Sequence, residues 1–169
     1  MITKPSLLVI TLAILLAGCQ GEYEVNCSDR PFVTTFINYT TADLDTFIIR
    51  KFKAADNYQT LLDTFKITYA GHEWPAAYTT SHDTTTVSIQ DRIHGITAGF
   101  DWQIFVPATN KTVLVSDIVS EKRTGKCKPG IGIFGKRDCS CYNRVFSAKM
   151  NNQVINFPDS NVYNIYIRN

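Results

Sequence analysis

The three histidines are the residues best suited to bind a metal ion or to transfer protons. They are His72, His82 and His94, and their spacing matches no common set of metal ligands. The sequence after His72 departs from the zinc-protease pattern H-E-x-x-H, because Ala76 stands where the second histidine is required and Pro75 would interrupt the helix. We therefore expect histidines in solvated loops, and neither a metal site nor a bound metal.

A glycine-rich run has the spacing of a dinucleotide-binding loop. Gly130, Gly132 and Gly135 fit the pattern G-x-G-x-x-G, which binds a cofactor only between a strand and a helix. Pro129 precedes the run, and the polar residues 136–141 that follow do not favour the start of a helix. The sequence therefore predicts a glycine-rich loop and no cofactor.

Nucleophilic catalysis has no recognisable sequence motif in this chain. The nucleophile elbow G-x-S-x-G of α/β-hydrolases is absent from the sequence. A Ser/His/Asp triad assembled from distant positions stays open, because triads are defined by geometry and not by order along the chain. The sequence therefore predicts no catalytic residue, with a hydrolase as the alternative.

Two aromatic residues are candidates for ligand binding. Trp74 and Tyr78 lie in a segment that we interpret as a loop, residues 71–78. Aromatic rings on the loops of a β-domain can stack on sugar rings, whereas in the alternative interpretation they cover one end of the core. Trp102 differs from them, because it alternates with Ile104 and is expected in the core.

A second candidate binding feature is the positive charge of residues 121–137. This stretch contains six of the 17 lysines and arginines and a single acid, so it could contact anionic lipid headgroups, lipopolysaccharide or a polyanionic glycan. The alternative is a solvated loop. With a net charge of only +2, the chain has no global field to attract nucleic acid, and we expect no nucleic-acid partner. The six cations are Lys122, Arg123, Lys126, Lys128, Lys136 and Arg137.

Most of the chain has the period-two pattern of half-buried β-strands, in which β-branched and aromatic residues alternate with polar ones. The predicted strands are residues 32–40, 45–53, 65–69, 87–89, 102–106, 112–119, 142–150, 154–157 and 163–167. Only residues 54–62 suggest a helix. This pattern predicts an all-β fold, namely a single antiparallel β-sandwich of Ig-like or transthyretin-like kind.

Two connections are predicted to be hairpin turns. Asn151 and Asn152 separate two apolar runs, and asparagine tolerates the positive φ that a two-residue hairpin requires. Residues 106–111, which include Pro107, are predicted to form the second connection.

The N-terminus has the parts of a bacterial export signal. Lys4 supplies positive charge, and residues 7–16 form an apolar run that is too short to span a membrane as a helix. Small residues follow, and the sequence Leu-Ala-Gly-Cys at residues 16–19 resembles the lipobox of bacterial lipoproteins. The resemblance implies that residues 1–18 are a signal peptide. It also implies that Cys19 becomes the first residue of the mature protein, carrying diacylglycerol and palmitate-type acyl chains that attach it to a membrane.

The resemblance also implies a location. Gln20 follows the lipobox cysteine in place of an aspartate, which favours the outer membrane, and the acidic residues 20–24 are similar to cell-surface export segments of some Bacteroidota lipoproteins. Residues 43–52 and 100–107 look like segments of small uncharacterised lipoproteins of Bacteroidota, which have no agreed activity. We therefore expect an outer-membrane lipoprotein, anchored by lipid at the periplasmic face or at the cell surface.

Four further cysteines are expected to form two disulfides in place of a zinc site, because an exported protein folds in an oxidising compartment. They are Cys27, Cys127, Cys139 and Cys141. A bond between Cys139 and Cys141 would be strained, since one residue separates them. Two pairings remain. Cys127–Cys139 with Cys27–Cys141 is favoured, because it clasps the glycine-rich loop and ties the lipid-proximal segment to the domain.

Length and composition indicate one folded domain. About 150 residues remain after the signal peptide, and a hydrophobic content of 44% is sufficient for a core. The predicted organisation is a signal peptide (1–18), a lipidated tether (19–27) and a β-sandwich (28–169). The predicted function is a non-enzymatic binding or structural role in the cell envelope, with an envelope glycan or envelope protein as partner. The alternative is a hydrolase of envelope or imported polymers.

Overall fold

The computed structural model describes residues 22–68, 76–89, 95–127, 141–160 and 162–169. These residues belong to two compact units. The smaller unit consists of two segments, the residues up to Cys27 and Arg123–Cys141. The larger unit consists of Ser28–Lys122 and Tyr142–Asn169. One boundary between the units falls after Cys27, and Arg123–Cys141, which were predicted to be part of the sandwich, belong to the smaller unit. No helix within the described residues is long and apolar enough to cross a membrane.

The smaller unit contains one antiparallel pair of strands. β1 (Tyr23–Asn26) pairs with β9 (Thr124–Cys127), and the N–H of Cys27 donates to the carbonyl of Arg123 at 2.8 Å. The segment predicted to be a tether therefore contains a strand. The alternation pattern did not indicate β1 because its side chains are mostly exposed and polar.

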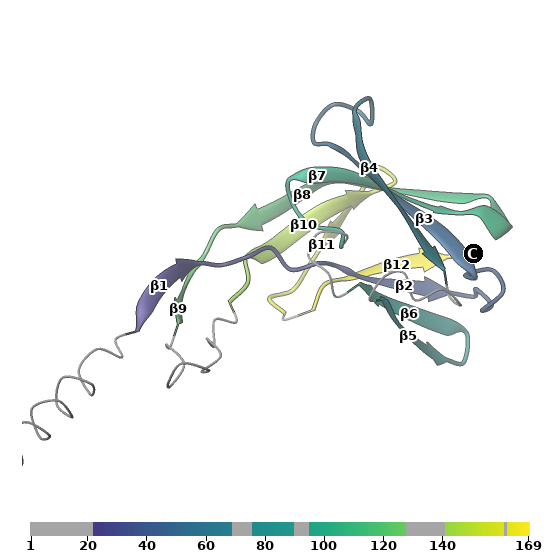
Figure 1. Cartoon of the computed structure of the whole chain (residues 1–169), viewed down its shortest axis with the longest axis horizontal. Coiled ribbons are helices and arrows are strands. Elements are labelled where there is room, and N and C mark those ends of the chain that lie inside the picture. Colours follow the sequence, from purple (N-terminus) through teal and green to yellow (C-terminus); the bar gives the residue numbers. More distant parts are fainter. Residues whose placement is uncertain (1–21, 69–75, 90–94, 128–140, 161) are drawn as a thin grey trace, which may run out of the picture. The chain divides into compact units, whose positions relative to one another are not determined.

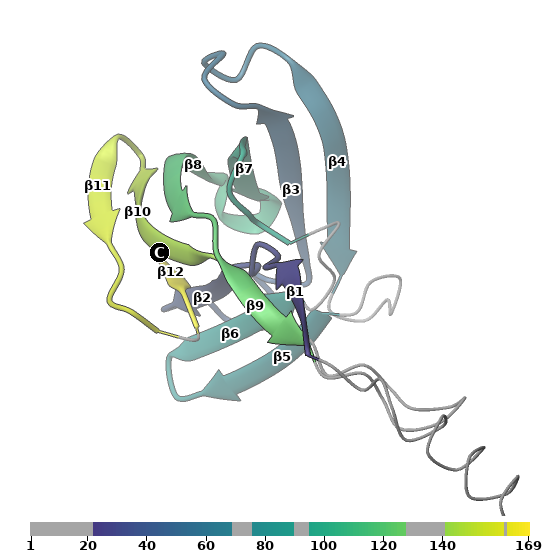
Figure 2. The same cartoon turned by 90° about the vertical axis from the view of Figure 1, so that its left-hand side faces the viewer.

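The larger unit is a sandwich of two β-sheets, so the predicted all-β sandwich is confirmed (Figures 1 and 2). One sheet has the strand order β11-β10-β8-β7-β3-β4, and the other has the order β12-β2-β6-β5. Strand pairs are antiparallel except for β12 and β2, which run parallel. The strands are β2 (Val33–Ile37), β3 (Thr46–Lys53), β4 (Leu61–Thr68), β5 (Ala76–Ser81), β6 (Thr84–Ile89), β7 (Phe100–Val106), β8 (Lys111–Glu121), β10 (Arg144–Met150), β11 (Gln153–Asn156) and β12 (Asn164–Arg168).

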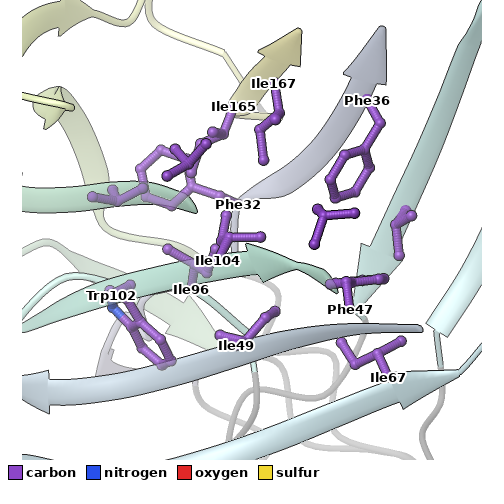
Figure 3. Close-up of a cluster of buried hydrophobic side chains, with 14 of the residues drawn as sticks. Phe32, Phe36, Phe47, Ile49, Ile67, Ile96, Trp102, Ile104, Ile165 and Ile167 are labelled. Carbon is purple, nitrogen blue, oxygen red and sulfur yellow. The ribbon is translucent and has the colours of Figure 1, made fainter. Parts of the chain in front are cut away.

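The core lies between the two sheets and follows from the alternation along the strands. Inward residues of both sheets, such as Phe36, Phe47, Ile49 and Ile165, are fully or almost fully buried (Figure 3). Trp102 is 0% exposed, as predicted. Its indole N–H donates to the carbonyl of Thr97 at 2.9 Å, which satisfies the one polar atom of this ring.

Both predicted hairpin connections are confirmed. Asn151 and Asn152 join β10 to β11 with φ of 48° and 66°, and Asn151 Oδ1 also accepts a hydrogen bond from the N–H of Leu114 at 2.9 Å. The second connection is a turn of 3₁₀ helix (Pro107–Thr109) that ends at Asn110 in the left-handed region. Asparagine supplies these positive φ values at low cost, because its short polar side chain tolerates the left-handed region.

The predicted helix at residues 54–62 is wrong. Residues 54–60 form a turn in which Ala55, Asn57 and Tyr58 have positive φ, and β4 begins at Leu61. The carboxylate of Asp56 accepts hydrogen bonds from the N–H groups of two later residues of the turn, at 3.3 and 3.0 Å. This side-chain acceptor competes with helical hydrogen bonds, so the segment forms a closed turn between β3 and β4.

Candidate functional site

An apolar groove at one side of the sandwich is a candidate site formed by described residues. Its volume is about 300 Å³, at the lower end of the roughly 300–1,000 Å³ of small-ligand pockets. Its walls come from the edge strands of the two sheets, β11 and β12, and from the chain that connects them (Figure 2). We call it the β11–β12 groove. It is lined by Met150, Ile155, Asn156, Phe157, Pro158, Ser160, Val162, Asn164 and Tyr166.

The groove rests on a cluster of packed rings. Phe157 follows β11, and its N–H donates to the carbonyl of Phe146 at 2.8 Å. Its ring packs against Phe32 and Tyr163, with centroids 5.2 and 5.7 Å away. The hydroxyl of Tyr163 accepts a hydrogen bond from the N–H of Val145 at 3.0 Å, which links the chain before β12 to β10. These contacts hold the wall of the groove in place before any ligand binds.

The groove offers mainly apolar contact, and its lining carries no charged side chain. Two of its lining side chains are about half exposed, Tyr166 at 51% and Val162 at 48%. The hydroxyl of Ser160 accepts a hydrogen bond from the N–H of Val162 at 3.1 Å, so it shapes the turn. The lining contains no histidine, cysteine or carboxylate. Such a surface can bind an apolar group and lacks the histidine and carboxylate side chains that most often transfer protons.

Of the two predicted aromatic binding residues, the structure places the backbone of one. Trp74 lies outside the described residues. Tyr78 lies in β5, opposite Val87 of β6, so its predicted place in a loop is wrong. The strand forms because β5 and β6 make a threonine-rich hairpin that turns at His82, where φ is 49°. β-branched threonine favours paired strands.

Only part of the predicted basic surface can be placed. Lys122 is exposed, and Lys126 forms an ion pair with Glu22 at 3.8 Å across exposed side chains, a geometry that contributes little. Arg123 is half-buried. The other three predicted cations, Lys128, Lys136 and Arg137, lie outside the described residues. A role for these cations in binding stays a prediction.

The histidines and acids that the structure describes form no metal site. Of the predicted loop histidines, His72 and His94 lie outside the described residues. His82 is exposed in the β5–β6 turn, where its Nδ1 lies 3.4 Å from the hydroxyl of Ser81. Within the described residues, no group of three histidines, cysteines or carboxylates could hold a metal ion.

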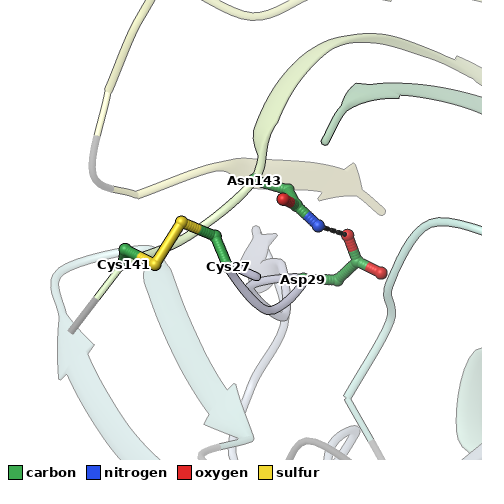
Figure 4. Close-up of a disulfide and its surroundings, with 4 residues drawn as sticks. All are labelled: Cys27, Asp29, Cys141 and Asn143. Carbon is green, nitrogen blue, oxygen red and sulfur yellow. Dashed lines mark hydrogen bonds between the residues drawn. A yellow bond between two sulfur atoms is a disulfide. The ribbon is translucent and has the colours of Figure 1, made fainter. Parts of the chain in front are cut away.

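The predicted disulfide between Cys27 and Cys141 is confirmed (Figure 4). Their Cα atoms are 5.0 Å apart, within the range for such a bond. Cys127 is also disulfide-bonded. Its predicted partner Cys139 lies outside the described residues, as does the lipid-bearing Cys19, so both of those assignments stay predictions.

A close approach next to this disulfide explains a glycine in β9. A Cβ atom on Gly125 would lie 2.6 Å from the Cβ of Cys141, a distance that real side chains do not reach. Any larger residue would therefore push the strand away from the disulfide. Only glycine allows β9 and Cys141 to be this close.

Asp101 is a buried carboxyl that the sequence did not indicate. It is 4% exposed on β7 and accepts a hydrogen bond from the N–H of Ala55 at 3.1 Å. Burial raises the pKa of Asp101 above its ordinary value, the Ala55 N–H lowers it, and the negative charges of Asp117 and Asp56 raise it further. The carboxyl anchors the β3–β4 turn, at an electrostatic cost when it is ionised.

Replacing Asp101 with asparagine is expected to change the pH dependence of stability. Because the folded-state pKa is raised, wild-type stability falls as the pH rises from the ordinary value of 3.8 through the folded-state pKa. The difference in free energy of unfolding, Asp101→Asn minus wild type, should therefore increase as the pH rises over that interval. Urea denaturation from pH 4 to pH 7 measures this difference, with the exposed Asp63→Asn as control. A difference that does not vary with pH would contradict the raised pKa of Asp101.

No protein-family model, no curated protein and no solved structure matches this chain. The protein is therefore characterised by its own fold and candidate site. The chain contains an all-β sandwich with an apolar, uncharged groove between the edge strands β11 and β12, one from each sheet. The Ig-like or transthyretin-like subtype stays a prediction.

Proposed function

We propose that this chain is an outer-membrane lipoprotein, anchored through lipid on Cys19, whose β-sandwich binds an apolar segment of another envelope protein without enzymatic chemistry. The observation that carries the binding role is the β11–β12 groove, which is apolar, about 300 Å³ in volume and supported by packed rings. The N-terminal resemblance supports the anchor and the location.

The chemistry of the groove favours a protein segment as the ligand over a glycan. Glycan sites combine aromatic platforms with polar groups that bind hydroxyls, whereas this groove is lined mainly by aliphatic and aromatic carbon. Tyr166 and Val162 expose about half of their surface, and burying such side chains on binding is favourable because apolar surface leaves water. Aromatic anchors of this kind often dominate the affinity of a protein interface.

Site-specific photo-crosslinking in intact cells tests the binding role. The photoreactive residue p-benzoylphenylalanine replaces Val162 in the full chain, and in a matched control it replaces the exposed Gln59 of the β3–β4 turn. We expect one defined envelope protein to be captured at position 162 and not at position 59, since only the former lines the groove.

A second substitution shows whether capture depends on the groove. Tyr166→Asp in the position-162 background should abolish the crosslink at an unchanged protein level, because a charge would be buried on binding. Mass spectrometry identifies the captured species. Equal capture at positions 162 and 59, or capture that is unaffected by Tyr166→Asp, would contradict the proposal.

The lipid anchor predicts a separate result. A clickable fatty acid should label the wild-type chain, while Cys19→Ala should lose the label and keep its uncleaved N-terminus, because the thiol is the attachment point in the lipobox. Cys27→Ala, which removes a cysteine of the disulfide, is the control and should keep the label. A labelled Cys19→Ala chain would contradict the anchor.

A further inference from the structure

Strand β12 has a free edge beside the β11–β12 groove. Among the described strands, β12 pairs only with β2. The carbonyl of Tyr163 accepts from the N–H of Val33 at 2.9 Å, and the N–H of Asn169 donates to the carbonyl of Ile37 at 3.1 Å. Both residues therefore direct their backbone groups toward β2.

The geometry of a strand determines where the remaining backbone groups point. Alternate residues of a strand direct their N–H and C=O groups to the same side. Between Tyr163 and Asn169, the backbone groups of successive residues therefore point away from β2 and toward β2 in turn. Asn164, Tyr166 and Arg168 consequently direct their N–H and C=O groups away from β2. They present three donors and three acceptors in the repeat that a further β-strand requires.

This free edge and the groove share residues. Asn164 and Tyr166 line the groove on the β12 side. The other wall includes Ile155 of β11 and Phe157, which directly follows β11. A strand laid along β12 would therefore place side chains in the groove. Since successive side chains of a strand point to opposite faces, alternate residues of such a ligand must be apolar.

The charge at this edge restricts the ligand further. Arg168 is exposed at the end of β12, and no carboxylate lines the groove. Asp159, on the connection between β11 and β12, forms an ion pair with Arg144 at 3.6 Å. A ligand with a carboxylate opposite Arg168 would complement the edge. A second copy that paired through its own β12 would instead bring another arginine and no acid.

From this arrangement we infer that the groove receives an extended peptide segment that adds to β12 as a further strand, with alternate apolar side chains and an acidic residue opposite Arg168. This inference rests on the proposed function and specifies the form of its ligand. Backbone hydrogen bonds would supply general affinity, and the groove and Arg168 would select the sequence.

Synthetic peptides test the inference on the full chain in lipid nanodiscs. The probes are blocked, fluorescein-labelled heptapeptides of alternating valine and threonine, with a glutamate at the first or at the last position. Fluorescence polarisation should show tighter binding for one glutamate placement, because Arg168 lies at only one end of the edge. N-methylation of one alternate set of residues should weaken binding about tenfold or more, and methylation of the other set should not.

Two variants of one residue isolate the backbone contribution. Tyr166→Ala and Tyr166→Pro both remove the aromatic ring, but only proline also removes the backbone N–H that points away from β2. Edge strands tolerate proline at such a position. Binding to Tyr166→Pro should be about three- to tenfold weaker than to Tyr166→Ala. Thermal melts of both variants check that the sandwich is intact. Arg168→Glu should reverse the preference from glutamate to lysine peptides.

The possible failures of the inference can be told apart. Absence of peptide binding at millimolar concentration, or equal effects of the two methylation sets, would overturn strand addition. A dimer of this chain that the peptide does not dissociate would also overturn it, in favour of a second copy. If crosslinking at position 162 still captures an envelope protein in these cases, the proposed function stands and only its extended-strand form is wrong.

Discussion

Trp102→Ala is expected to lower the free energy of unfolding by about 4 kcal/mol, because removing a buried tryptophan loses its apolar contacts and leaves a cavity. The side chain is fully buried on β7, in the middle of the six-stranded sheet between β3 and β8. This loss is a large part of the roughly 5–15 kcal/mol that stabilises a typical domain. Urea denaturation followed by far-UV circular dichroism measures it.

Two further variants separate the causes of this loss. Phe105→Ala changes an aromatic residue on the same strand that is only half-buried, so its effect should be less than half as large. Trp102→Phe keeps a ring but removes the indole N–H that bonds Thr97, leaving a buried carbonyl unpaired at a cost of about 1–3 kcal/mol. Equal losses for Trp102→Ala and Phe105→Ala would show that the two sheets are not packed around Trp102.

Removal of the Cys27–Cys141 disulfide is expected to have the other large effect. The bond joins residues 114 positions apart, and closing a loop of that length in the unfolded chain stabilises the folded state by about 5 kcal/mol in the chain-entropy model. The double variant Cys27→Ser/Cys141→Ser should therefore melt roughly 10–20 °C below the wild type. Differential scanning calorimetry measures the shift.

The matched variant is Cys27→Ala/Cys141→Ala, which tests whether the new hydroxyls cause the loss. It should melt close to the serine variant. Gly125→Val should produce a similar loss with free thiols at Cys27 and Cys141, because its side chain would occupy the position of the Cys141 side chain. A shift of only a few degrees in all three would mean that the unfolded chain gains little freedom when the bond is absent.

The parts of the fold that the sequence predicted are those with a local physical signal. The alternation of Trp102 with Ile104 indicated a strand with one buried face, and the asparagine pair at residues 151 and 152 indicated a hairpin. Strain excludes a bond between the close neighbours Cys139 and Cys141, and of the two pairings left, the one with Cys27–Cys141 is favoured because it ties the lipid-proximal segment to the domain. For the strand and the hairpin, a few adjacent residues are sufficient to decide the structure.

The parts that the sequence did not predict depend on distant contacts. Residues 54–60 have helical composition, but their turn is held by Asp101 from another strand. The β11–β12 groove arises where the edges of two sheets come together, so no single segment contains its pattern. Val162 and Tyr166 of its lining are exposed large hydrophobic residues, but single exposed residues of this kind are common on protein surfaces.

The parallel pairing of β12 with β2 has a consequence for the order of folding. Asn164 of β12 lies beside Val33 of β2, so the four-stranded sheet joins the last residues of the chain to some of the first. A ribosome releases the chain from its N-terminus, so until β12 emerges, β2 has an open edge and the core lacks Ile165 and Ile167. Contacts of such large sequence separation form slowly. Pairing of β12 with β2 is therefore expected to be a late step in the folding of the sandwich.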